Sequence, residues 1–274
     1  MRVCKIAVPL HTVISFSVIN YVVSMRCLTR VTQLIFFIFY RKDSYICRAL
    51  NKIHHMRVLI TGTSQGIGKA IAEKFLSKGH HVIGIDRVAQ SISDESYIHF
   101  QCDVRDFENL PEIDDVDILI NNAGTQNEGD IDTNLKALIK VTEKYGIRSG
   151  IRSILNIGSA SGHTGAEFPE YCASKGGVIA YTKNVALRVA QFSATCNSLD
   201  PGGVLTPLND CVVNDPQLWR EIMEQTPLKR WASAEEIAQW AYFLTVDNSF
   251  CTGQSIVVDG GESINSHFVW PSSI

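Results

Sequence analysis

The sequence lacks the features that mark metal, disulfide and nucleic-acid sites. Its 8 cysteines form no Cys-x-x-Cys pair and follow no regular spacing, so we predict neither a metal site nor a disulfide framework. No cluster of Lys and Arg occurs after Met56, and that part of the chain holds 17 Lys and Arg against 27 Asp and Glu. This acidic balance argues against a nucleic-acid partner. Unpaired cysteines favour a reducing, cytoplasmic location.

The first 55 residues have the opposite charge balance, with 8 Lys and Arg and the single acid Asp43. Residues 6–25 carry no charged side chain, but Pro9, His11 and Asn20 dilute their hydrophobicity. A membrane-spanning helix needs about 20 mostly apolar residues. Two interpretations stay open: an upstream extension before a natural start at Met56, or a membrane or targeting segment. Membrane association is therefore expected only if residues 1–55 belong to the native protein.

Residues 56–274 are predicted to form one domain, because no repeat, low-complexity tract or Pro-rich linker divides them. Short apolar strands alternate with amphipathic helices, which is typical of a parallel sheet covered on both faces. We predict the α/β class: a single doubly wound Rossmann-type domain with a seven-stranded parallel sheet, preceded by the extension. The expected strands cover 57–61, 81–85, 97–102, 116–120, 153–157, 194–199 and 255–258, and the expected helices cover 68–77, 135–145, 171–191 and 234–244.

One segment, 206–230, is polar, contains three prolines and lacks a clean helical or strand periodicity. We expect it to be a mobile insertion on the substrate side of the domain.

A glycine-rich turn lies between the first strand and the first helix. Glycines permit a tight turn and a close backbone approach to a pyrophosphate, while the helix N-terminus supplies free amide donors. An ordinary strand-to-helix turn is the alternative. The predicted phosphate-binding residues are Gly62, Ser64, Gln65, Gly66, Ile67 and Gly68.

Asp86 ends the second expected strand, 18 residues after Gly68. An acid at this place accepts hydrogen bonds from the adenosine ribose and repels a 2′-phosphate. We therefore predict NAD as the cofactor. NADP is the alternative, because the neighbouring Arg87 would suit a 2′-phosphate.

Ser159, Tyr171 and Lys175 are the candidate catalytic residues. Tyr171 and Lys175 lie one helical turn apart on one face, and Ser159 follows an expected strand. A phenol is a poor base near pH 7 because its ordinary pKa is about 10, so we expect the lysine ammonium to lower it. Ser159 would orient the substrate oxygen, and Tyr171 would exchange its proton. The alternative is that Tyr171 packs against the sheet, Lys175 is solvated and Ser159 caps a turn.

These motifs together resemble the short-chain dehydrogenase/reductase family over nearly all of residues 56–266. The resemblance implies an oxidoreductase that moves a hydride between NAD(H) and an alcohol or carbonyl carbon of a small molecule. It also implies a homodimer or homotetramer. Asn134 would be a fourth catalytic member that holds a water linked to the lysine, although a helix N-cap is its alternative role. Further cofactor contacts are implied for Asp103, Val104, Asn122, Ala123, Gly124, Tyr171, Lys175, Pro201, Gly202, Val204 and Thr206.

The chain departs from the family pattern before Asn134, which only nine residues separate from Gly124. Relatives usually carry a longer stretch there, including much of a helix that contributes to subunit packing. Two other functions remain open: an NADPH-dependent 3-oxoacyl-[acyl-carrier-protein] reductase, and a non-catalytic dinucleotide sensor. Residues that would line or cover the substrate pocket, or merely pack, are His163, Glu167, Phe168, Leu208, Trp219 and Met223.

Overall fold

A computed structural model describes residues 55–126, 129–166 and 168–265. The chain divides into a unit that ends at His54 and a unit that begins at His55, and the described residues all belong to the second unit. The expected extension, with residues 6–25, therefore lies outside the described part of the chain. Within that part, no helix is both long enough and apolar enough to cross a membrane.

The seven-stranded parallel sheet predicted from the sequence is confirmed, and the structure shows that its strand order is β3-β2-β1-β4-β5-β6-β9. Every neighbouring pair in it is parallel. The central strands are almost wholly buried because helices cover both faces, which explains the continuous apolar runs at 58–60 and 118–120. The strands are β1 (Arg57–Thr61), β2 (His81–Asp86), β3 (Tyr97–Gln101), β4 (Ile118–Asn121), β5 (Ser153–Ile157), β6 (Thr195–Pro201) and β9 (Ser255–Val258).

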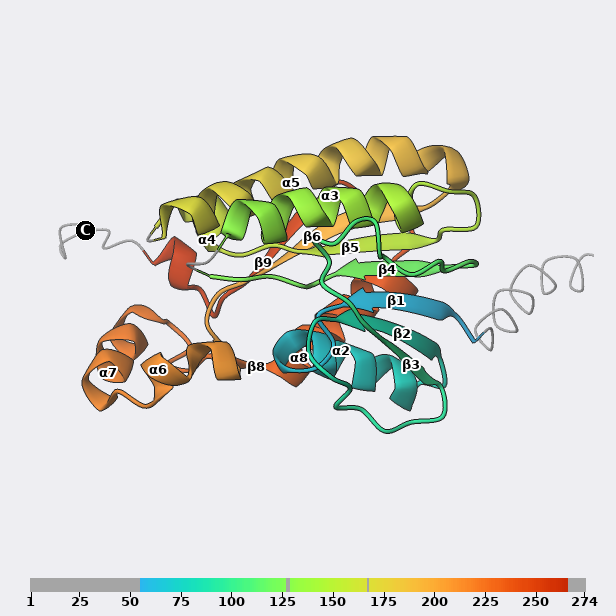
Figure 1. Cartoon of the computed structure of the whole chain (residues 1–274). Coiled ribbons are helices and arrows are strands. Elements are labelled where there is room, and N and C mark those ends of the chain that lie inside the picture. The colour runs from blue at the N-terminus through green and yellow to red at the C-terminus, as the bar shows by residue number, and fades with distance from the viewer. Residues whose placement is uncertain (1–54, 127–128, 167, 266–274) are drawn as a thin grey trace, which may run out of the picture. The chain divides into compact units, whose positions relative to one another are not determined.

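Helices cover the sheet on two sides (Figure 1). One layer contains α2 (Gly66–Ser77) and α8 (Ala234–Tyr242), and α8 continues as η6 (Phe243–Asp247). The other layer contains α5 (Pro169–Val189), which ends in η4 (Ala190–Phe192), and a helix formed by η2 (Ile131–Ala137), α3 (Leu138–Val141) and η3 (Thr142–Gly146). The doubly wound arrangement predicted from the sequence is thus confirmed.

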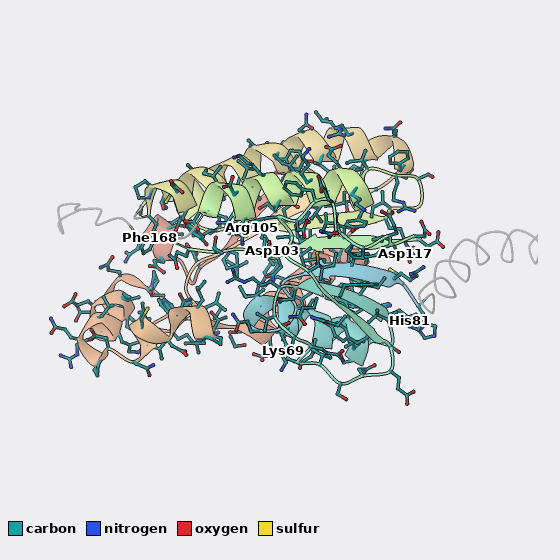
Figure 2. All side chains as sticks on the ribbon, viewed as in Figure 1. Lys69, His81, Asp103, Arg105, Asp117 and Phe168 are labelled. Carbon is teal, nitrogen blue, oxygen red and sulfur yellow. The ribbon has the colours of Figure 1, made fainter. Side chains whose placement is uncertain are left out.

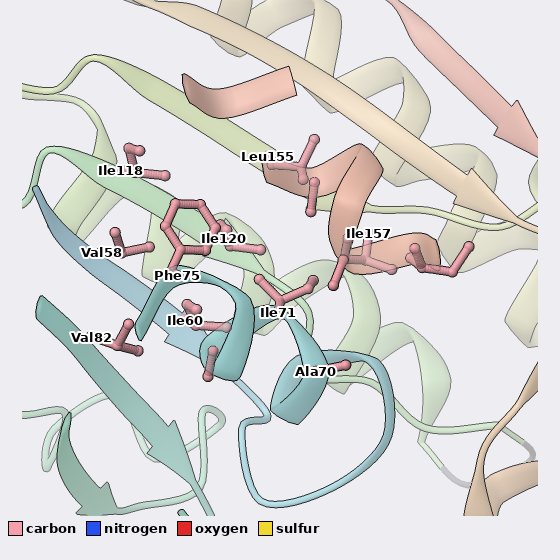
Figure 3. Close-up of a cluster of buried hydrophobic side chains, with 14 of the residues drawn as sticks. Val58, Ile60, Ala70, Ile71, Phe75, Val82, Ile118, Ile120, Leu155 and Ile157 are labelled. Carbon is pink, nitrogen blue, oxygen red and sulfur yellow. The ribbon is translucent and has the colours of Figure 1, made fainter. Parts of the chain in front are cut away.

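Each layer has its own apolar core. Figure 3 shows the core under α2, where Phe75 and Ile71 pack onto side chains of β1 and β4 such as Ile60 and Ile120. The core under α5 contains Tyr145 among many aliphatic side chains. Along β1 and β4 the side chains alternate between these two cores, because successive strand residues point to opposite faces.

The segment 206–230 is largely helical, which its sequence pattern did not reveal, and its mobility stays a prediction. It contains η5 (Pro207–Asn209), α6 (Asp210–Val213) and α7 (Pro216–Gln225). Asp215 caps α7 by accepting hydrogen bonds from the backbone of Gln217 and Leu218. The segment also lies between two short paired strands, β7 (Val204–Leu205) and β8 (Ala232–Ser233), which the sequence did not reveal. A two-residue strand carries no periodicity that a sequence pattern could show.

Candidate active site

The sheet order reverses between β1 and β4, whose neighbours continue outward on opposite sides. In open α/β sheets a ligand crevice forms at this reversal, outside the carboxyl ends of the strands. A cavity of about 860 Å³ opens there, within the range of small-molecule and cofactor sites. The predicted site residues that line it are Gly62, Gln65, Gly66, Ile67, Asp86, Asp103, Val104, Asn122, Ala123, Gly124, Ser159, Tyr171, Lys175, Pro201, Gly202, Val204 and Thr206.

The glycine-rich turn has the backbone geometry that the sequence predicts. Gly62 has φ +76°, in the left-handed region that favours glycine. A Cβ on Gly68 would lie 1.9 Å from the Gly62 carbonyl oxygen, so α2 approaches the turn too closely for any side chain. The amino end of α2, with Gln65 before its first residue, therefore faces the cavity with its free amide groups.

Replacing Gly68 by Ala should open this turn. The added methyl group must displace the Gly62 carbonyl, which we expect to destabilise the fold by about 1–3 kcal/mol and to weaken NADH binding about tenfold or more. Thermal melting and NADH fluorescence titration measure the two effects. The control is Gly176→Ala in α5, whose Cβ would meet nothing closer than an oxygen at 3.6 Å. Equal NADH affinity in the two variants would contradict the role of the turn.

Asp86 is tied to the glycine-rich turn. One of its carboxylate oxygens accepts a hydrogen bond of 2.8 Å from the Ser64 amide, and the other accepts one of 2.9 Å from the Val88 amide. Ser64 itself is buried and also donates from its hydroxyl to the Val88 carbonyl. The carboxylate and the neighbouring Arg87 both line the cavity, so an acid that would repel a 2′-phosphate and a base that would bind one lie side by side.

Asp103 lies next to Arg105 in the loop after β3, as Figure 2 shows. The Arg105 Nη2 and Nε atoms donate to the Asp103 carboxylate at 2.6 and 3.0 Å, and this pairing holds the pKa of Asp103 below its ordinary value. Val104 between them is buried in the core under α5. This loop therefore forms one wall of the cavity with its charges already paired.

The loop after β4 is fixed to the glycine-rich turn. Asn122 donates from Nδ2 to the carbonyls of Thr61 and Gly62, each at 3.0 Å. The Thr61 hydroxyl accepts from the backbone of Asn122 and Ala123. These bonds hold two cavity walls at a fixed separation.

Ser159, Tyr171 and Lys175 converge on the same cavity, although they come from two different elements. Ser159 follows β5, whereas Tyr171 and Lys175 lie on α5. The Ser159 hydroxyl is hydrogen-bonded to the Tyr171 phenol. The Lys175 Nζ atom lies 5.6 Å from the centroid of the Tyr171 ring and donates to the Ile157 carbonyl at 2.8 Å. The three predicted residues are thus neighbours in space.

The electrostatics differ from the sequence-based expectation. Burial raises the pKa of the Tyr171 phenol, the Ser159 hydrogen bond lowers it, and the nearby Asp130 raises it further. Burial also lowers the pKa of Lys175 to about 8. The expected lowering of the phenol pKa is therefore wrong for this arrangement, because desolvation of the tyrosine exceeds the favourable contributions.

Asn134 does not reach the lysine ammonium through its side chain. Its Nδ2 atom donates to the Thr125 carbonyl at 3.0 Å and to the Ser174 hydroxyl at 3.1 Å, and its Oδ1 atom accepts from the Thr125 amide. The residue is buried in the middle of η2, so the alternative role as a helix N-cap is wrong. Asn134 therefore links the short loop after Gly124 to the residue that precedes Lys175.

The predicted pocket residues separate into two groups. Phe168 and Leu208 line the cavity. Trp219 packs edge-on against Trp231 instead, with ring centroids 5.1 Å apart. Met223 accepts a hydrogen bond from Lys229 through its carbonyl, and Glu167 lies outside the described residues.

Three polar residues near the site escaped the sequence analysis or were misplaced by it. Thr133 lines the cavity and is buried, and its hydroxyl has no hydrogen-bond partner among the described residues. His163 pairs with Asp200 at 2.6 Å rather than lining the pocket. The sequence held one signal that Asp200 lies near the site. It is an ionisable residue directly before Pro201 and Gly202, which were predicted to contact the cofactor.

Comparisons with known proteins agree with this geometry. A family model described as enoyl-(acyl carrier protein) reductase matches residues 62–263. The 3-oxoacyl-[acyl-carrier-protein] reductase FabG of Buchnera aphidicola subsp. Schizaphis graminum is 34% identical, over 77% of this chain and 98% of the relative. The chain belongs to the short-chain dehydrogenase/reductase family. As a member of that family it is an NAD(P)-dependent oxidoreductase with a small-molecule substrate.

Solved structures of this family include dehydrogenases with either cofactor. A 4-hydroxyisoleucine dehydrogenase complexed with NADH has a TM-score of 0.68 and 27% identity, covering 77% of this chain and 100% of that chain. A putative 2-deoxy-D-gluconate 3-dehydrogenase from Agrobacterium tumefaciens with bound NADP has a TM-score of 0.68 and 29% identity, covering 77% and 97%. The residues of this short-chain dehydrogenase/reductase fit a dinucleotide, because the close approach at Gly68 leaves no room for a Cβ and the amino end of α2 beside it lines the cavity.

Proposed function

We propose that this enzyme interconverts an alcohol and a ketone with Tyr171 as the proton donor and acceptor. The observation that supports this most is the convergence of three residues from two elements. Ser159, Tyr171 and Lys175 line one cavity that also borders the glycine-rich turn. Such a cavity can hold the substrate oxygen beside the phenol.

Each side chain has a separate task in this proposal. The bound nicotinamide would supply or accept the hydride. Tyr171 gives its proton to the substrate oxygen in reduction and removes it in oxidation. Ser159 donates a hydrogen bond that orients the same oxygen. Lys175 stabilises the tyrosinate electrostatically and binds the cofactor. Asn134 holds the loop after Gly124 against α5 through its bonds to Thr125 and Ser174.

Turnover assays test the proposal. Oxidation of NADH and NADPH is measured with a set of carbonyl compounds that includes neutral ketones, the keto product of 4-hydroxyisoleucine, the keto product of 2-deoxy-D-gluconate and an acetoacetyl thioester. We expect turnover with at least one of them. NADH binding without turnover across a broad set would favour the dinucleotide sensor instead.

A 3-oxoacyl thioester reductase is the second candidate function. The similarity to FabG favours it, whereas the acidic balance of residues 56–274 gives no excess of basic residues for an acidic carrier protein. Faster NADPH-dependent reduction of an acetoacetyl thioester than of any other compound in the set would establish this function.

NAD is our proposed cofactor, and Asp86 is the residue that would select it. Replacing Asp86 by Asn keeps a side-chain acceptor for one of the two backbone amides and removes the charge that repels a 2′-phosphate. We expect the ratio of kcat/KM for NADH over NADPH to fall about tenfold or more. A wild-type preference for NADPH, or an unchanged ratio in the variant, would contradict this assignment.

A homodimeric or homotetrameric assembly and a cytoplasmic location also stay predictions. Sedimentation of the purified chain and fractionation of cells that produce it test them directly.

A further inference from the structure

Asp200 is a completely buried acid beside the candidate active site. It lies near the end of β6, and its relative exposure is 0%. A Cβ on Gly158 would lie 1.9 Å from the Asp200 Oδ1 atom, so the residue before Ser159 must be glycine if the carboxylate is to fit. A buried carboxylate is costly unless it is paired and hydrogen-bonded. Its partners therefore indicate what it does.

Two side chains donate to this carboxylate. His163 Nε2, from α4 (Ser161–Thr164), lies 2.6 Å from the Oδ2 atom, and the Ser198 hydroxyl donates to the Oδ1 atom. Burial raises the pKa of Asp200, while the bonds from Ser198 and His163 and the charge of Lys175 lower it. The His163 side chain is one-third exposed, so the pair connects a buried acid with solvent.

Lys175 and Asp200 are held against consecutive residues at the carboxyl end of β5: the Lys175 Nζ atom donates to the Ile157 carbonyl at 2.8 Å, and the Asp200 Oδ1 atom packs against Gly158. Because Lys175 is buried, its ammonium needs a counter-charge. Burial lowers the pKa of its ammonium to about 8, and the two groups that raise it are Asp200 first and Asp130 second. Asp130, which precedes η2, also acts on Tyr171, where it raises the phenol pKa. The charge of Asp200 therefore favours the ammonium of Lys175.

We propose that Asp200 is a positioning residue that keeps Lys175 protonated, and that His163 keeps Asp200 ionised by donating a hydrogen bond to it. The inference rests on the proposed function, since it assigns the ammonium a part in turnover and cofactor binding. The two acids that favour the Lys175 ammonium then come from different elements, Asp200 from β6 and Asp130 from the position before η2.

The test is the pH dependence of NADH binding and of kcat, or of NADPH binding if that is the cofactor. Asp200→Asn keeps the shape and removes the charge; its amide oxygen can accept from His163 while its Nδ2 atom donates to the Ser198 hydroxyl. We expect affinity and kcat to begin their decline at a pH about one unit lower than in the wild type, with values near the wild type at more acidic pH. Asp117→Asn is the matched control, because Asp117 is a hydrogen-bonded acid before β4, at the opposite end of the sheet.

Variants of His163 test the second half of the proposal. His163→Gln retains an N–H donor, so its alkaline decline should stay in place. His163→Leu removes the donor, so its decline should shift in the same direction as that of Asp200→Asn. The alkaline decline of the double variant Asp200→Asn/His163→Leu should shift no further than that of Asp200→Asn alone, because position 200 then carries no charge that His163 could stabilise.

The outcomes separate this proposal from the proposed function. A purely structural role for Asp200 would lower stability or kcat by the same factor at every pH and leave the decline where it is in the wild type. That result, combined with an inactive Tyr171→Phe variant, overturns only the role of Asp200. Full turnover in Tyr171→Phe would overturn the proposed function itself.

Discussion

Replacing Tyr171 by Phe is expected to lower kcat about 10³-fold. Among the described residues of the proposed site, the phenol interacts with Ser159 and can exchange a proton with the substrate oxygen. Positioned proton transfer contributes about 10²–10⁴-fold to enzymatic rates. NADH affinity should remain within about threefold of the wild type, because the ring and Lys175 stay in place. Steady-state kinetics and NADH fluorescence titration measure both quantities.

Tyr181→Phe is the control for this experiment. Tyr181 lies on the same helix, but its hydroxyl donates to Glu143 at 3.0 Å rather than facing the cavity. The control variant should keep its turnover. If Tyr171→Phe retains more than about a tenth of the wild-type kcat, another group must transfer the proton.

Replacing Lys175 by Met is expected to lower activity while raising stability. The lysine pKa falls from 10.5 to about 8 in the fold, and each pKa unit corresponds to about 1.4 kcal/mol. Burying the charged amine therefore costs about 3 kcal/mol, and losing its hydrogen bond to the Ile157 carbonyl costs about 1 kcal/mol. We expect a net gain of about 2 kcal/mol at neutral pH, or roughly 5 °C in melting temperature. Turnover should fall about 10²-fold or more, because the tyrosinate loses its cation.

The stability difference should depend on pH in a defined direction. Below about pH 8 the folded lysine is charged, and the wild type carries the whole cost of burial. Between pH 8 and 10.5 the folded state has lost the proton that the unfolded state still binds, so the wild type gains stability as the pH rises. Melting temperatures of both proteins from pH 6 to 10 measure this convergence. A constant difference over that range would contradict a lysine with a lowered pKa.

Activity and stability thus oppose each other at one position. The fold keeps an amine where an apolar side chain would be more stable, and two acids, Asp200 and Asp130, limit the cost. Residues maintained against stability in this way are typical of functional sites. The pattern supports the part that Lys175 has in the proposed function.

The strands and the site motifs could be predicted from the sequence because their signals are local. Val58, Leu59 and Ile60 form a short apolar run before a glycine-rich turn, and that order indicates a buried strand followed by a phosphate-binding loop. Tyr171 and Lys175 are four residues apart on a helix, so their shared face follows from the helical period alone. Ser159 was placed correctly because parallel strands bring their carboxyl ends to one edge.

The sequence by itself determined the fold class, the cofactor turn and the residues that meet in the cavity, since each depends on spacing along the chain. Only the tertiary structure decided that Asp200 lies against His163, 37 positions earlier in the chain, and that Asn134 bonds to Ser174. It also reversed the expected direction of the Tyr171 pKa. Desolvation and cross-chain pairing depend on which atoms exclude water around a group, and that is set by the packing of distant segments rather than by neighbours in the sequence.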